Sequence, residues 1–297
     1  MIIKSYESIR IKNITFSTEY RVNFDYIYKF HKVTDHSKKA LLNRKIWLST
    51  QESLNDPFEG VTKTIYPTDR TDLITKCVNY MTEMLCDEEN LEKSHAQNIV
   101  LQRYLENPDG FLEIVLEQAK KEHNSAIEHT RNLGIYSTSA DIPNDERSHI
   151  ANMIMWSLYA DGFKGFCIKY NAKELYRSLR ELNSEDKFSY TKVNYVTQPY
   201  EVDLFSLVHK DNIAYLKALQ FKHEQWEHEC ECRILSTSAG LKEISQNSIE
   251  AIYFGDKISE QNEIGLIEIM QQSFPNTPIF RVKLDSQSYG IRVGEKI

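Results

Sequence analysis

Hydrophobic residues near the start of the chain follow a strand, helix, strand order. Residues 26–30 (YIYKF) are rich in aromatic and β-branched side chains, which is typical of a strand, and residues 46–49 (IWLS) predict a second strand. The spacing between them predicts a short helix over residues 37–44. Residues 54–60 (LNDPFEG) combine Asn, Asp, Pro and Gly, so we expect a turn or loop that carries carboxylates.

A long helical segment follows, from about residue 72 to residue 131. Its apolar positions recur at helical spacing, as at Leu73, Cys77 and Tyr80, with polar residues between them. The sequence Asn-Pro-Asp-Gly at 107–110 divides the segment into at least two helices. We therefore expect a helical insert whose charged faces serve simple packing, form a lid or contact a protein partner, and we favour packing.

Beyond residue 134 the pattern changes to short strands that alternate with helices. Strands are predicted over residues 135–139, 165–170, 190–196, 230–236, 252–255 and 279–284. Helices are predicted over residues 150–160, 172–182, 204–221 and 262–274. The spacing lacks the long uniform repeat of a parallel βαβ fold. We predict an α+β fold: a mixed or largely antiparallel sheet with interleaved helices and a helical insert.

The chain has 297 residues, of which 41% are hydrophobic, and this is enough to form a substantial core. No Pro-, Gly- or Ser-rich linker and no internal repeat interrupts it. Residues 1–297 are therefore expected to form one elaborated domain, with residues 1–25 as an amino-terminal extension.

The chain is expected to stay in the cytoplasm without membrane contact. Its amino terminus lacks the apolar run of a signal peptide, and no stretch approaches the roughly 18 apolar residues of a membrane span. The five cysteines form an odd, sparse set that fits a reducing compartment better than a disulfide framework. The formal net charge of -7 excludes a global basic field for nucleic acid but leaves a local basic groove open.

The most informative segment is residues 226–235 (WEHECECRIL), which we interpret as a strand. Side chains on a strand alternate between its two faces. The alternation predicts one face with Glu227, Glu229, Glu231 and Arg233 and an opposite face with Trp226, His228, Cys230, Cys232 and Ile234. Neighbouring carboxylates disfavour simultaneous ionisation unless a guanidinium, a metal or a cationic substrate compensates their charge. The segment is therefore either a reactive centre or a solvated edge strand with an Arg–Glu ladder.

Cys230 and Cys232 have two interpretations. They are either small hydrophobic residues of the core or, together with His228, zinc ligands. No second Cys or His pair at zinc spacing accompanies them, so we favour the core and expect no structural metal.

Two polar segments are further candidates for a site. Asn55, Asp56 and Glu59 follow a predicted strand in a loop, from which their side chains either reach a cleft or cap the turn. Ser137 and Ser139 end a strand, where their hydroxyls either orient a ligand amide or cap the next helix.

Trp156 and Tyr159 lie one helical turn apart on a predicted helix. They form either a stacking wall for a ligand ring or part of the core.

Common catalytic motifs are missing from the chain. It contains no G-x-x-x-x-G-K-[ST], G-x-G-x-x-G, G-x-S-x-G or H-E-x-x-H sequence. Nucleotide triphosphate hydrolysis, dehydrogenation and serine esterase chemistry therefore lose their usual support.

An ordered set of motifs extends from about residue 28 to residue 255. The motifs are Tyr28-Lys-Phe, Leu54-Asn-Asp-Pro-Phe-Glu59, Ser137-x-Ser139, Met155-Trp156-x-x-Tyr159-Ala with Gly165, and Trp226-x-x-Glu229-x-Glu231-x-Arg233. In combination they resemble the bacterial family catalogued as domain of unknown function 2971. That resemblance implies no established activity.

A looser resemblance is to ADP-ribosyltransferases, including the DNA-modifying toxin type. Those enzymes open with an aromatic and basic strand, use a Ser-Thr-Ser-like strand, and carry a late catalytic glutamate often written E-x-E. The corresponding candidates here are Lys29 and His31, Ser137 to Ser139, and Glu229-x-Glu231.

This second resemblance implies NAD as a substrate. Glu231 would stabilise the oxocarbenium-like centre left by loss of nicotinamide, and Glu229 would activate the accepting group. The resemblance further assigns phosphate contacts to Lys29 and Arg233, ring stacking to Trp156 or Tyr159, and other NAD contacts to His31, Ser137 and Ser139. It implies a toxin or phage-defence effector whose acceptor is a protein or a nucleic acid.

Two other functions stay open. A metal-dependent nuclease would bind Mg²⁺ and the scissile phosphate through Asp56, Glu59, Glu229, Glu231 and either Lys222 or Arg233. A non-enzymatic binding module of a defence system would use the helical insert for a protein partner and the acidic strand as structure.

Overall fold

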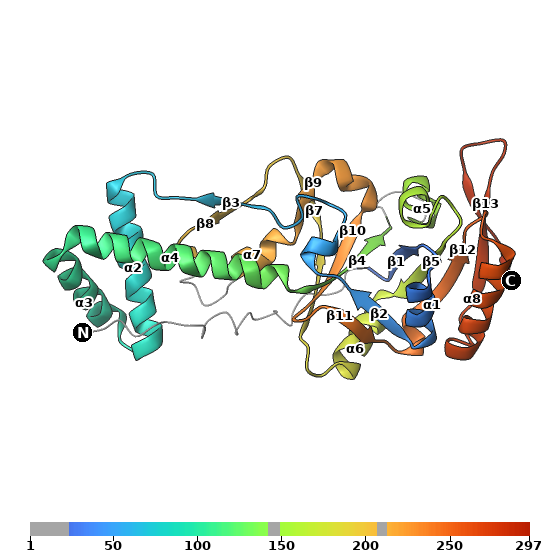
Figure 1. Ribbon diagram of the computed structural model, residues 1–297, viewed down its shortest axis with the longest axis horizontal. Helices are drawn as coiled ribbons and strands as arrows, with labels where there is room; N and C mark the ends of the chain where they lie inside the picture. The colour runs from blue at the N-terminus through green and yellow to red at the C-terminus, as the bar shows by residue number, and fades with distance from the viewer. Residues whose placement is uncertain (1–23, 142–148, 207–212) are drawn as a thin grey trace. The chain divides into compact units, whose positions relative to one another are not determined.

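The computed structural model describes residues 24–141, 149–206 and 213–297, which form two compact units (Figure 1). Unit 1 comprises Phe58–Arg131 and Val196–Phe221. Unit 2 comprises residues 24–57 together with Asn132–Tyr195 and Lys222–Ile297. Almost all of the predicted amino-terminal extension lies outside the described residues, and the expected single elaborated domain remains a prediction.

Unit 2 is built on an eight-stranded sheet in the order β14-β13-β12-β5-β1-β4-β10-β6. Its strands are β1 (Tyr26–His31), β4 (Gly134–Ala140), β5 (Phe166–Asn171), β6 (Phe188–Lys192), β10 (Glu231–Ser236), β12 (Ile249–Phe254), β13 (Ile279–Leu284) and β14 (Ile291–Lys296). Neighbouring strands are antiparallel except β12 and β13, which are parallel. The predicted α+β class with a largely antiparallel sheet is confirmed.

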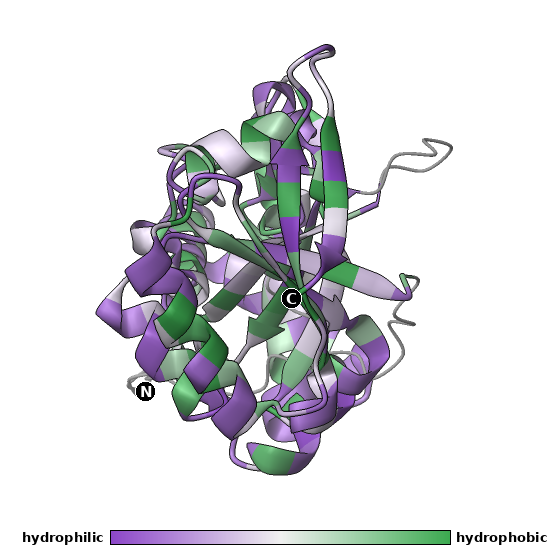
Figure 2. Cartoon of the chain, turned by 90° about the vertical axis from the view of Figure 1, so that its right-hand side faces the viewer, coloured by the Kyte–Doolittle hydropathy of each residue, from purple (hydrophilic) through white to green (hydrophobic). Residues whose placement is uncertain are grey.

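Helices cover both faces of this sheet. Face A carries Ile27 and packs against α1 (Asp35–Leu42), α6 (Ala172–Leu182) and α8 (Glu260–Ser273). Face B carries Tyr28 and Phe30 and packs against α5 (Met153–Tyr159). Hydrophilic and hydrophobic residues alternate along the helices and strands in Figure 2, as expected for elements that bury one side.

Strands β1 and β4 stay together over a short distance only. They pair at two positions, the second of which joins Tyr28 to Ser139. Further along β4, the backbone of Ile135 exchanges two hydrogen bonds with Ser49, which follows β2 (Lys45–Leu48). The edge of β4 is therefore shared between β1 and the end of β2.

Lys29 bridges the gap that this separation leaves. Its Nζ donates a hydrogen bond of 2.6 Å to the backbone carbonyl of Ser137 and lies 5.2 Å from the ring centre of Tyr136. A buried carbonyl without a partner would be costly, so the ammonium replaces the donor that a neighbouring strand would have supplied.

Gly165 joins α5 to β5 through a tight turn. Its N–H donates to the carbonyl of Ala160 at 2.8 Å, and a Cβ at this position would lie 2.1 Å from the carbonyl oxygen of His31. Only glycine allows the chain to pass this close to β1.

Unit 1 contains the predicted helical insert, as α2 (Arg70–Glu89), α3 (Lys93–Glu106) and α4 (Pro108–Arg131). Apolar residues of these helices form one cluster with Leu204 and Phe205. The parallel strands β3 (Thr62–Ile65) and β8 (Tyr200–Asp203) and helix α7 (Ile213–Ala218) complete the unit. The break before α4 is confirmed, whereas the break at Asn90, whose backbone is left-handed, was not predicted.

Several short elements differ from the sequence expectations. The helix predicted over residues 204–221 is reduced to α7, followed by β9 (Phe221–His223), while residues 207–212 lie outside the described chain. The strand predicted over residues 190–196 divides into β6 and β7 (Asn194–Val196), and β7 pairs with β9. The remaining short elements are β11 (Gly240–Glu243), η2 (Gln51–Ser53), η3 (His149–Ala151), η5 (Glu224–Glu229) and η6 (Gln246–Ser248).

Among the described helices, none has the length and apolar character needed to cross a membrane.

Candidate functional site

The acidic segment begins as a 3-10 helix, η5, and not as a strand. Cys230 then adopts a left-handed backbone with φ of 44°, and β10 starts at Glu231. The predicted alternation is therefore wrong before Glu231: Glu227 is exposed and Cys230 is only half-buried. It holds from Glu231 onward, where Cys232 is buried in the core on face A.

Three adjacent strands bring candidate residues together on face B. Ser139 of β4 pairs with Tyr28 of β1 on one side and with Glu231 of β10 on the other. Ser137 pairs with Arg233. Directly paired residues of antiparallel strands point to the same face, so both serines, Glu231 and Arg233 share face B with Tyr28.

Glu231 and Arg233 form a buried bidentate ion pair. The guanidinium Nε lies 2.7 Å from Oε1 and Nη2 lies 3.0 Å from Oε2. Arg233 has no exposed surface, and Glu231 is 2% exposed. The Ser137 side chain adds a hydrogen bond to the Glu231 carboxylate.

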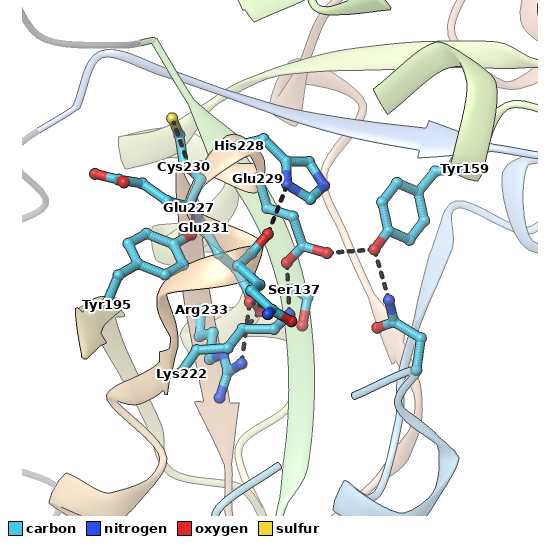
Figure 3. Close-up of polar contacts among 12 residues, drawn as sticks. Ser137, Tyr159, Tyr195, Lys222, Glu227, His228, Glu229, Cys230, Glu231 and Arg233 are labelled. Carbon is cyan, nitrogen blue, oxygen red and sulfur yellow. Dashed lines mark hydrogen bonds and ion pairs between the residues drawn. The ribbon is translucent and has the colours of Figure 1, made fainter. Parts of the chain in front are cut away.

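Lys222 connects this pair to the second glutamate (Figure 3). Its Nζ lies 2.5 Å from Oε2 of Glu229 and 3.1 Å from Oε2 of Glu231, and its other side faces the ring of Trp226 at 4.9 Å. We call Lys222, Glu229, Glu231 and Arg233 the ion cluster. All four side chains are buried, and their two positive charges balance their two negative charges.

A hydrogen-bonded chain leads out of the ion cluster. The hydroxyl of Tyr159, at the end of α5, donates to Oε1 of Glu229, and Nδ2 of Asn55 donates to the same hydroxyl at 2.6 Å. On the other side, the backbone N–H of Glu231 donates to the hydroxyl of Tyr195 at 2.7 Å. Segments far apart in sequence therefore hold the Glu229 carboxylate and the backbone of Glu231 in position.

The surroundings keep Glu231 ionised. Burial raises its pKa, but the charge and hydrogen bonds of Arg233, the charge of Lys222 and the hydrogen bond from Ser137 outweigh burial, so the pKa lies well below its ordinary value. Burial lowers the pKa of Lys222, but the charges of Glu231 and Glu229 outweigh it and raise the pKa. Glu231 and Lys222 are therefore both charged throughout the neutral range.

Lys29 and His31 have backbone positions that point to face A, opposite the ion cluster. Their partners on β5 are Ile168 and Phe166, both in the face A core, and the His31 ring stacks on Phe166 at 5.1 Å. Burial lowers the pKa of Lys29 more than the charges of Glu231 and Glu229 raise it, and burial together with the charge of Lys29 lowers the pKa of His31 to about 3. The two basic side chains of β1 are thus half-buried on face A.

Trp156 is a core residue in this structure. It has no exposed surface, its ring lies 5.3 Å from Phe30 and 5.6 Å from Phe163, and its Nε1 donates to the carbonyl of Ile150 at 2.7 Å. Its ring faces are covered, so in this conformation it anchors α5 and offers no stacking surface.

The loop predicted to carry carboxylates divides between the two units. Asn55 and Asp56 belong to unit 2, and Asp56 is buried there. Glu59 belongs to unit 1. The structure therefore brings Asn55 to the ion cluster through Tyr159.

Metal binding has little support in the geometry. Among the described residues, no group of three or more His, Cys, Asp or Glu side chains is arranged to hold a metal ion. The position between Glu229 and Glu231 is taken by the ammonium of Lys222. All five cysteines lie in the described chain and are free thiols.

The sequence did not indicate Tyr195 as a member of the site and gave Lys222 a different role. Lys222 was a candidate only for contact with a scissile phosphate, and Tyr195 was not a candidate. The contact of Lys222 with Trp226 had no local signal either, because Lys222 lies on β9 and Trp226 on η5. The contact of Tyr195 depends on the path of β7 and has no signal in the sequence.

Residues 155–234 match the family model DUF2971, which is described as a protein of unknown function. The resemblance to this family is thereby confirmed, and the matched residues include Tyr159 and the whole ion cluster. No curated protein and no solved structure matches the chain.

Proposed function

We propose that unit 2 transfers ADP-ribose from NAD to a macromolecule, with Glu231 as the carboxylate that stabilises the developing positive charge. The observation that carries this proposal is the order of three strands. The basic strand β1, the Ser-Thr-Ser strand β4 and the Glu-x-Glu strand β10 are neighbours in one sheet, and Ser139 pairs with both others. These are the elements that the resemblance to ADP-ribosyltransferases names for NAD.

The chemistry requires a fixed negative charge. The bond between nicotinamide and the ribose C1′ breaks, its electron pair leaves with the neutral nicotinamide, and positive charge develops on the ribose. An acceptor nucleophile then forms a bond to C1′ and gives up its proton, which Glu229 takes. Glu231 is held ionised and immobile by Arg233, Lys222 and Ser137, which suits electrostatic stabilisation without reorganisation.

The contacts change four roles that the resemblance assigns. Lys29 and His31 lie on face A, with the Lys29 ammonium on the carbonyl of Ser137 and the His31 ring on Phe166, so in this proposal they support the sheet and do not contact NAD. Arg233 has its guanidinium on Glu231, so in this proposal it orients the carboxylate and does not bind phosphate. Trp156 is enclosed in the core, so it supports α5 and does not stack on the substrate.

The test is incubation of the wild-type chain with NAD labelled in its ADP-ribose part and with mixed protein, DNA and RNA acceptors. We expect nicotinamide release and transfer of label, and a loss of about 100-fold or more in Glu231→Gln. Glu227→Gln is the matched control, because Glu227 lies in the same segment but is exposed. Absence of nicotinamide release from the wild type, or equal rates in Glu231→Gln, would rule out the proposal.

A further inference from the structure

We infer that Tyr159, itself oriented by Asn55, is a positioning residue that sets the direction of the Glu229 carboxylate. The inference rests on the proposed function, in which Glu229 takes the proton of the acceptor. It joins three motifs that the sequence left unconnected: the loop around Asn55, helix α5, and the end of η5.

The direction of the hydrogen bonds follows from the number of protons. A phenol hydroxyl has a single proton to donate. The amide Nδ2 of Asn55 donates to the Tyr159 oxygen at 2.6 Å, so the hydroxyl proton is left for Oε1 of Glu229. Burial and the hydrogen bond to Glu229 raise the pKa of Tyr159, so the hydroxyl keeps this proton throughout the neutral range.

The two glutamates differ in the charge of their partners. Both carboxylate oxygens of Glu231 contact cations: Oε1 contacts Arg233, and Oε2 contacts both Lys222 and Arg233. Within residues 24–141, 149–206 and 213–297, the cation that Glu229 contacts is Lys222, through Oε2, whereas Oε1 accepts from the neutral Tyr159 hydroxyl. The Tyr159 hydroxyl carries no charge, so its hydrogen bond to Oε1 lacks the full Coulombic attraction of an ion pair. Oε1 is therefore the oxygen of Glu229 that turns more readily towards an incoming proton.

Helix α5 gives Tyr159 a rigid base. Trp156, one turn earlier, is fully enclosed and bonded to the carbonyl of Ile150, and Asn152 caps the helix through the backbone N–H groups of Ile154 and Met155. Because α5 holds the Tyr159 hydroxyl in place, the hydroxyl fixes the direction of the Glu229 carboxylate. A mobile hydroxyl would instead adjust to the carboxylate.

Tyr159→Phe tests the inference directly, because it removes the hydroxyl and keeps the ring. With NAD as substrate we expect kcat to fall about 10-fold or more while KM for NAD stays within about 2-fold. Asn55→Ala should lower kcat less, and the double variant should be no slower than Tyr159→Phe, because Asn55 acts through the hydroxyl. A stacking role for the ring would instead leave the Tyr159→Phe rate unchanged and would overturn the inference.

Tyr176→Phe is the matched control. The Tyr176 hydroxyl also lies in unit 2 and donates to a buried partner, the carbonyl of Phe188 at 2.8 Å, but it does not contact the ion cluster. Its kcat should equal that of the wild type. An equal loss in Tyr176→Phe would assign the effect to general destabilisation and overturn the inference.

A second readout does not depend on turnover. In protein labelled with 3-fluorotyrosine, the ¹⁹F resonance lost in Tyr159→Phe identifies Tyr159. We expect this resonance to shift in Glu229→Gln and in Asn55→Ala but not in Tyr176→Phe. If the wild type releases no nicotinamide and the resonance still shifts, the proposed function fails and the orientation of Glu229 by Tyr159 stands. If the Tyr159 resonance does not shift in Glu229→Gln, the inference is overturned, whatever the enzymatic activity.

Discussion

Arg233 and Glu231 stand two residues apart on β10 and meet through two hydrogen bonds, from Nε to Oε1 at 2.7 Å and from Nη2 to Oε2 at 3.0 Å. Residues two apart on a strand share a face, so the pair is complete within its own strand. Lys222 and Ser137 then add contacts from β9 and β4. The stability of unit 2 therefore depends on a buried charge pair whose two members must be kept together.

Arg233→Met should destabilise unit 2 by about 3–5 kcal/mol, because it leaves the buried Glu231 charge without its principal partner. Urea denaturation of both proteins at neutral pH measures this difference. Arg177→Met is the control: Arg177 forms an exposed pair with Glu174 on α6, for which about 0–1 kcal/mol is expected. Equal losses in the two variants would contradict the buried role of Arg233.

The stabilisation that Glu231 provides should depend on pH in a definite direction. Its folded pKa is depressed, so its contribution is fully present above the ordinary carboxyl pKa and is lost as pH falls towards the folded value. Glu231→Gln removes the titration. The difference in unfolding free energy between wild type and Glu231→Gln should therefore be largest near neutral pH and shrink below about pH 4. A difference that is constant from pH 7 to pH 3 would show that the charge of Glu231 is not the cause.

Lys222→Met should also destabilise the protein, and adding Glu229→Gln to this variant should restore part of the lost stability. Without the ammonium, Glu229 and Glu231 face each other as like charges in a buried site, and removing one charge relieves the repulsion. Thermal unfolding of the two single variants and the double variant measures the coupling. A double variant as unstable as the sum of the single variants would show that Lys222 does not hold the two carboxylates together.

His149 should make the protein sensitive to mild acid. Its side chain is buried against Tyr28 and Phe30, and neither ring nitrogen has a hydrogen-bond partner in the described part of the chain. Burial lowers the pKa of His149 to about 4, with Asp141 opposing and His228 adding to the shift. In the unfolded chain the His149 imidazole binds a proton below about pH 6.5, whereas in the folded protein it stays neutral down to about pH 4. The free energy of unfolding therefore falls by up to about 1.4 kcal/mol per pH unit between these two pH values.

His149→Phe should flatten this part of the pH profile while keeping an aromatic ring in the core. Unfolding free energies at pH 7, 6 and 5 for both proteins measure the difference. Parallel profiles would show that His149 does not cause the acid sensitivity.

Elements with strong local signals were predictable. Helix α6 was predicted at residues 172–182, as observed. In the structure Asn171 caps its first turn and its apolar residues lie on one buried face. Strands β11 and β14 were missed because they are mostly exposed edge strands in which polar residues dominate. Their formation depends on partners, since β11 pairs with β2 and β14 with β13.

The site was predictable where its geometry is local. Glu231 and Arg233 share a face because they are two residues apart on one strand. Strand alternation does not account for Glu229, although the prediction grouped it with Glu231 and Arg233, because Glu229 ends a 3-10 helix and the left-handed backbone of Cys230 follows it. Glu229 reaches the ion cluster through Lys222, and this contact requires β9 to lie beside the start of β10.

The contact between β4 and β1 at the carbonyl of Ser137 differs from the contacts of β4 on either side of it. On either side, β4 is joined to Tyr28 and to Ser49 by main chain, and such links survive almost any replacement of a side chain. At Ser137 the link is the side chain of Lys29, which a single codon change removes. The stability of the contact between β1 and β4 therefore depends on the side chain at one position, residue 29. Substitutions there, natural or selected in the laboratory, can weaken or strengthen the contact without altering the path of the backbone.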